Sequence, residues 1–152
     1  MPAEMSPDRL AELVAETLEE AAFVFAEPAD PPPPFHGDVL EARLRFAGPS
    51  RGELALRASA GFAEGLAANL LGMEPSDPEI GTRSRDALGE IVNMLAGAVV
   101  LELFGPAAQT SIGVPAVRGA AGAAPGSCLA HLATEEGERL DVWLQPSPGS
   151  SP

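Results

Sequence analysis

Three polar residues, Asp86, Glu90 and Asn93, have the spacing that places side chains on one face of a helix. At about 100° per residue, Glu90 falls about 40° from Asp86, and Asn93 about 20° away on the other side. A carboxylate can pair with a cation of a partner, and a carboxamide can hold and orient a water molecule. Gly97 leaves the next turn of this face without a side chain. The pattern indicates a two-pronged polar site suited to docking by another surface.

A simpler interpretation is a solvated helix face on which Gly97 only permits close packing, since charged residues on helices usually face water. Asn93 favours a functional role, because asparagine in a helix interior costs up to ~0.7 kcal/mol relative to alanine. The residues of this segment by themselves leave both interpretations open.

Charge and composition exclude several classes of function. The 152 residues include 22 acidic and 9 basic side chains, for a net charge of −13. Nucleic acid and anionic membranes are therefore unfavourable partners. Every basic residue is an arginine. Without a lysine the chain cannot supply a phosphate-loop lysine, a Schiff base or a Ser–Lys dyad, and we expect no cofactor of its own.

The single cysteine, Cys128, cannot form an internal disulfide, and the acidic N-terminus is unlike a signal peptide, so we expect a cytoplasmic protein. The apolar run 91–104 is too short and too polar to span a bilayer. His36 and His131 together with Cys128 are too few for a zinc site, so no metal is expected in this chain.

Periodicity predicts a single α+β domain over residues 1–146 with a mobile tail at 147–152. The predicted helices are 8–25, 60–71 and one capped by Thr82 or Ser84 that runs to Phe104. The predicted strands are 39–46, 53–57, 109–117, 127–134 and 139–145. The proline-rich segment 27–37 is expected to be an extended linker within the domain.

The segment Asp86-Ala-Leu-Gly-Glu90-Ile-Val-Asn93, followed by Pro115, resembles the signature of the CheC/CheX/FliY phosphatase family. The stretch from Glu90 to Gly97 is most similar to CheX. The order of predicted elements agrees: a helix, a hairpin, two helices and then strands. The resemblance implies a CheC-like α+β fold, with helices packed on a mainly antiparallel sheet and a degenerate internal duplication.

The resemblance also implies a function: hydrolysis of the phosphoaspartate of a CheY-type response regulator. Glu90 would contact the phosphorylated receiver domain and Asn93 would orient the attacking water. Asp86 would support the site and Pro115 would shape an adjoining loop. The lysine and the Mg²⁺ would belong to the partner, and a homodimer is expected. The alternatives are a CheX-like adaptor or flagellar-switch module without activity, and a small-ligand sensory domain.

The first predicted helix carries a weak echo of the third. When the two helices are superposed by sequence, Glu90 falls on Glu12 and Asn93 falls on Ala15. Amphipathic helices also resemble one another by chance. If the echo reflects duplication, the first helix is an inactive second site, because Ala15 cannot hold a water molecule.

Overall fold

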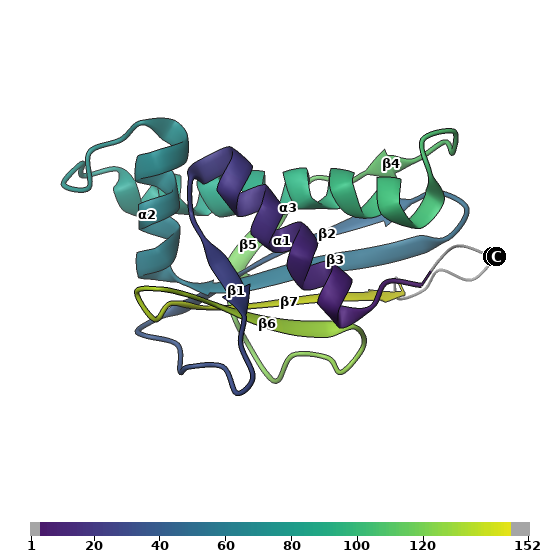
Figure 1. Cartoon of the computed structure of the whole chain (residues 1–152). Helices are drawn as coiled ribbons and strands as arrows, with labels where there is room; N and C mark the ends of the chain where they lie inside the picture. Colours follow the sequence, from purple (N-terminus) through teal and green to yellow (C-terminus); the bar gives the residue numbers. More distant parts are fainter. Residues whose placement is uncertain (1–3, 147–152) are drawn as a thin grey trace.

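The computed structural model describes residues 4–146 (Figure 1). The helices are α1 (Pro7–Ala22), α2 (Ala60–Leu71) and α3 (Ile80–Phe104). The strands are β1 (Ala26–Pro28), β2 (Val39–Ala47), β3 (Arg51–Ser59), β4 (Ser111–Ile112), β5 (Ala116–Gly119), β6 (Leu129–Thr134) and β7 (Arg139–Pro146). The helices gather on one face of the sheet (Figure 1), which confirms the predicted α+β fold.

The seven strands of the described chain form one antiparallel sheet in the order β1-β6-β7-β3-β2-β4, and β5 also pairs with β2. This order is nearly symmetric about the central pair β3–β7. The hairpin β2–β3 carries β4 and β5 on its outer side, and the hairpin β6–β7 carries β1. Because α1 precedes β1 as α3 precedes β4 and β5, the topology repeats one unit twice, and α1 is the counterpart of α3.

The core lies between the helices and the sheet. Leucine, isoleucine and valine recur at helical spacing on α1 and α3 and alternate along β3 and β7. The side chains that are almost entirely withdrawn from solvent include Leu10, Leu18, Leu54, Leu56, Leu88, Ile91, Leu95, Leu132 and Leu140. Burying such a side chain contributes about 1.5–3 kcal/mol, so this layer holds the helices in place.

Helix α3 is the central element of the helical layer and packs against α1, α2 and the sheet. Of the described helices, it alone is long and apolar enough to cross a membrane by length and composition. Half of its most apolar 18-residue stretch is buried inside the fold. The core helix of a globular domain has the same composition, and the apolar side of α3 serves this purpose here.

The opposite face of the sheet carries charged side chains from β2, β3 and β7. Arg57 pairs with Glu41 at 2.7 Å and donates hydrogen bonds to the carbonyl oxygens of Ala121 and Gly122. Its guanidinium also lies 5.1 Å from the centroid of the Trp143 ring, which is fully buried. These contacts hold the glycine-rich loop between β5 and β6 against this face.

Two N-terminal predictions need correction. The predicted helix 8–25 ends at Ala22, because Phe23 adopts the left-handed conformation at φ 56° and ends α1. The predicted linker 27–37 begins inside strand β1, whose backbone pairs with β6. Neither feature is visible in local composition, since the pairing partner of β1 lies about a hundred residues further along the chain.

Two later predictions also need correction. Helix α3 begins at Ile80, with Glu79 as N-cap, and neither Thr82 nor Ser84 caps it. The side chain of Ser84 instead donates to the carbonyl oxygen of Gly81. The predicted strand 109–117 is divided into β4 and β5, because Pro115 has no N–H group for a ladder. The predicted mobile tail, 147–152, lies outside the described residues.

Candidate functional site

The third helix brings Asp86, Glu90 and Asn93 to one exposed face, as their spacing predicts. They line one wall of a hollow of about 590 Å³. The other wall comes from the segment between β4 and β5, which we call the 113–115 loop, and it includes Pro115. Four of the five predicted site residues therefore lie around one hollow, which forms where α3 meets the edge of the sheet.

The 113–115 loop is held tightly on both sides. The backbone N–H of Gly113 donates to the carbonyl oxygen of Arg45 at 2.8 Å. A Cβ at Gly113 would lie only 3.0 Å from that oxygen, so glycine permits this close approach. On the other side, a Cβ on the buried Gly89 would meet Pro115 Cγ at 3.5 Å and Val117 Cγ2 at 3.6 Å. The loop therefore lies beside this turn of α3, at a distance where a Cβ would make ordinary van der Waals contact with it.

Glu90 and Asn93 are available to a partner. Neither side chain makes a hydrogen bond or an ion pair within residues 4–146, and both are exposed. Their neighbours are engaged: Asp86 pairs with Arg83 at 3.2 Å, and Arg85 donates to the carbonyl oxygen of Val117 at 3.3 Å. The exposed end of the site thus presents one free carboxylate and one free carboxamide, side by side on the helix.

Apolar side chains border the hollow, and sequence reasoning missed them. Val114 is 90% exposed at the tip of the 113–115 loop, and Ile112 beside it is 36% exposed, whereas Met94, 40% exposed on α3, does not line the hollow. The interpretation of 109–117 as one strand concealed Val114, since it treated the residue as part of a ladder. The adjoining Gly113 and Pro115 are the signal that could have identified a loop.

Gly97 is the predicted site residue that does not line the hollow. It lies about one turn beyond Asn93 on α3 and is half-buried. A Cβ there would meet nothing within 4 Å, so close packing among the described residues 4–146 does not require glycine at this position. This argues against the interpretation that Gly97 serves only to permit close packing. It leaves a stretch of helix without a side chain beside Glu90 and Asn93.

The other candidate chemistry is accounted for by structural contacts. The thiol of Cys128 contacts the carbonyl oxygen of Met5 at 3.0 Å, and burial raises the pKa of Cys128. His131 Nδ1 lies 2.6 Å from a carboxylate oxygen of Asp141. Among the residues that the structure describes, no three His, Cys, Asp or Glu side chains gather closely enough to hold a metal ion.

Solved structures of similar fold come from several bacteria. CheX from Desulfovibrio desulfuricans is 19% identical, with 90% of this chain and 96% of that chain covered and a TM-score of 0.64. CheX in the CheX–CheY–BeF3–Mg²⁺ complex from Borrelia burgdorferi is 18% identical over 90% and 94% of the chains, with a TM-score of 0.67. CheX from Vibrio vulnificus is 17% identical over 93% and 100%, with a TM-score of 0.63.

No curated protein matches the sequence significantly. The family model for chemotaxis phosphatase CheX matches residues 41–126, more than half of the chain. The match begins within β2 and contains β3, α2, α3, the 113–115 loop and β5, so it includes the whole candidate site. The chain therefore belongs to the CheX family of chemotaxis phosphatases.

Proposed function

We propose that this protein hydrolyses the phosphoaspartate of a CheY-type response regulator, and that Glu90 and Asn93 are its catalytic residues. The observation that carries the proposal is the pair itself. A free carboxylate and a free carboxamide stand side by side at an exposed hollow, in a chain of the CheX family. The CheX of Borrelia burgdorferi has been solved with CheY and Mg²⁺, which supports a receiver domain as the partner.

The carboxamide of Asn93 positions water for an in-line attack. The water oxygen forms a bond to phosphorus, and the bond between phosphorus and the aspartyl oxygen breaks. The aspartate leaves as a carboxylate with the electron pair of that bond, while the protons of water pass to phosphate and solvent. A phosphoaspartate is a reactive mixed anhydride, so positioning supplies most of the catalysis.

Glu90 and the apolar rim fix the orientation of the partner. A carboxylate that pairs with a cation of the receiver domain sets the register, and this pairing strengthens as docking excludes water. Val114 and Ile112 present apolar surface around the same hollow, and burying it adds affinity without competing for the phosphoryl group. Asp86 and Pro115 shape the walls. The Mg²⁺ belongs to the partner.

An adaptor without activity is the alternative for the same fold. An adaptor needs a docking surface, but it has no use for a carboxamide held free beside a carboxylate. The side chain of Asn93 makes no hydrogen bond within residues 4–146, so it adds nothing to the stability of the helix that carries it. An asparagine that is unfavourable for the helix and unused by the fold favours the enzyme. We further propose that the reaction takes place in the cytoplasm.

Phosphate release from a panel of phosphorylated receiver domains tests the function. We expect the wild-type protein to accelerate release from at least one domain, and Asn93→Ala to lose about 10²-fold of that acceleration. Gln109→Ala, which removes an exposed carboxamide outside the hollow, is the matched control and should retain full activity. Tight binding of a phosphorylated domain without faster release by the wild-type protein would establish the adaptor instead.

A further inference from the structure

A second hollow, of about 610 Å³, lies where the C-terminal end of α1 meets α2 and the turn between β6 and β7. None of its lining residues belongs to the hollow around Glu90 and Asn93. Phe23 and Phe25 form one wall, and α2 forms the floor with Gly61, Gly65 and partly buried Ala68. We call it the phenylalanine groove.

Phe23 is unfavourable for the folded chain by itself. Its backbone is left-handed, with φ 56° and ψ 34°, where glycine or asparagine is the usual residue at a helix C-terminus. A residue with a bulky side chain is strained in this conformation, whereas glycine adopts it without strain. The ring is also 79% exposed, so it gains little by burial, and the ring of Phe25 two residues later is 64% exposed. Two of the six phenylalanines, separated only by Val24, are thus exposed to solvent.

The floor of the groove contains two glycines that are unfavourable for the stability of α2. Gly61 and Gly65 lie inside α2, where glycine is less favourable than alanine. A Cβ at either position would meet nothing within 4 Å, so no contact within the described chain requires glycine. Their spacing places both on one side of the helix, toward Phe23 and Phe25. An exposed, smooth helix surface of this kind allows another backbone to approach closely.

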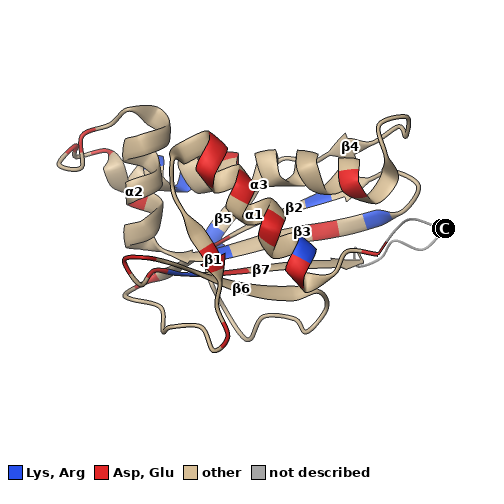
Figure 2. Ribbon diagram, viewed as in Figure 1, with Lys and Arg blue, Asp and Glu red and all other residues tan. Residues whose placement is uncertain are grey.

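The far rim of the groove is acidic. The β6–β7 turn contributes Glu135, Glu136 and Glu138, and it lies below α2 in Figure 2. Glu138 accepts a hydrogen bond from Ser59, which caps α2, whereas Glu135 and Glu136 are exposed and make no ion pair within residues 4–146. No arginine lines the groove. The rim therefore adds attraction for positive charge to the apolar walls.

From these costs and charges we propose that the phenylalanine groove binds a basic, amphipathic helical segment of another protein. Apolar side chains of that segment pack between Phe23 and Phe25, its backbone lies along the glycine face of α2, and its Lys or Arg residues face Glu135 and Glu136. A second copy of this chain is the less favourable occupant, because each copy carries a net charge of −13 and the rim would repel it.

The test is selection of a displayed library of random 16-residue peptides on the wild-type protein, followed by titration of the enriched peptides. We expect Lys- and Arg-rich sequences with apolar residues three and four apart, and binding that weakens with salt. Phe23→Gly should weaken binding by about 30-fold, as loss of a hot-spot aromatic does, while it raises the melting temperature by a few degrees. Leu101→Ala removes another exposed apolar side chain, on α3, and should change neither binding nor phosphate release.

The gain in stability separates this proposal from simple unfolding, because Phe23→Gly should bind worse while folding better. Gly65→Ala provides a second such variant, since a methyl group there should stabilise α2 and obstruct the segment. Enrichment of acidic peptides, no enrichment at all, or equal binding by Phe23→Gly would overturn the proposal. So would a wild-type dimer that Phe23→Gly converts to monomer, which would identify the occupant as a second copy.

Discussion

Glu90 and Asn93 lie three residues apart on the same face of α3, and we propose different roles for them. The carboxamide acts on water, which matters mainly in the transition state, whereas the carboxylate acts on the partner in both the ground state and the transition state. Neither side chain is used by the fold within the described residues, so substitutions at these positions report on function rather than on stability.

We predict that Asn93→Ala lowers kcat while binding to a phosphorylated receiver domain largely survives, and that Glu90→Ala weakens binding and also slows turnover. Alanine is the better helix former, so Asn93→Ala should stabilise α3 by a few tenths of a kcal/mol. Melting, binding and single-turnover dephosphorylation measured on the same three proteins check these expectations. A melting temperature far below the wild-type value would show that Asn93 is structural.

At the scale of elements, α1 occupies the position of α3 in the other half of the duplicated sheet. Its side chains do not repeat the site. In the alignment of the two helices by sequence, Ala15 falls at the position of Asn93, and Glu12 pairs with Arg9 at 3.3 Å instead of being free. The two halves therefore share their topology but not these side chains.

We predict that Glu12→Ala leaves phosphatase activity near the wild-type level, because α1 has no group to hold water beside it. Phosphate release from the cognate receiver domain measures this directly, with Glu90→Ala as the reference for a real loss. Equal losses in the two variants, with both proteins folded, would show that α1 also acts as a site.

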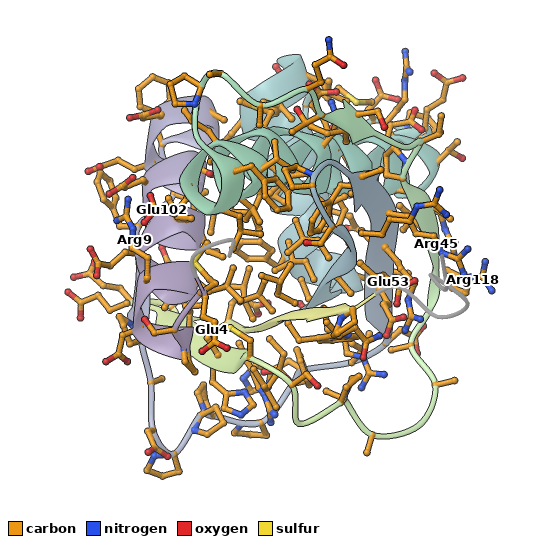
Figure 3. All side chains as sticks on the ribbon, turned by 90° about the vertical axis from the view of Figure 1, so that its right-hand side faces the viewer. Glu4, Arg9, Arg45, Glu53, Glu102 and Arg118 are labelled. Carbon is orange, nitrogen blue, oxygen red and sulfur yellow. The ribbon has the colours of Figure 1, made fainter. Side chains whose placement is uncertain are left out.

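A second interaction at this scale joins α1 to α3. The Arg9 guanidinium donates to both carboxylate oxygens of Glu102, at 2.9 and 3.0 Å (Figure 3). This hydrogen bond lowers the pKa of Glu102 and raises that of Arg9. Helical periodicity puts Glu102 toward the apolar side of α3, but in the structure its side chain is exposed and reaches Arg9 on the neighbouring α1.

The lowered pKa of Glu102 sets the sign of its pH dependence. Its stabilising effect is complete above the ordinary pKa of a glutamate and is lost as the pH falls through the lowered, folded-state value. We predict that Glu102→Gln lowers the melting temperature at neutral pH and that the difference from wild type shrinks in acid. Glu64→Gln, on α2, is the matched control, because it removes an exposed carboxylate that makes no ion pair within residues 4–146. If the difference in melting temperature between Glu102→Gln and wild type were the same at neutral and acid pH, the charge of the Arg9–Glu102 pair would contribute nothing to stability.

At the scale of the whole molecule, the sheet has two open edges. One edge is β1, where Glu27 and Pro28 disfavour pairing with another strand. The other edge is formed by β4 and β5. Strands β6 and β7 are interior, so of the strands that follow α3 only β4 and β5 can extend the sheet.

We predict a homodimer, with β4 and β5 as the edge available for sheet extension. Sedimentation velocity over a range of concentrations should show twice the 15.6 kDa mass of one chain. Phe23→Gly should remain dimeric, because the phenylalanine groove lies away from this edge. A species of one-chain mass at high concentration would contradict the prediction.

The sequence by itself was sufficient for the α+β class, for the long third helix and for the single face shared by Asp86, Glu90 and Asn93. These features depend on periodicity within one element, and burial of the apolar side of a helix fixes its polar side by geometry. Pro115 was included in the predicted site only because of the resemblance to the family signature.

The tertiary structure alone placed Pro115 against Gly89, paired Arg9 with Glu102 and exposed Val114, Phe23 and Phe25. Each of these depends on which distant segments meet. The strand β1 and the 113–115 loop each contain too few residues for a periodic pattern to be recognised in the sequence. Both are defined by backbone hydrogen bonds to remote partners. An apolar side chain is exposed when no other segment packs over it, and the local sequence does not show which distant segments will do so.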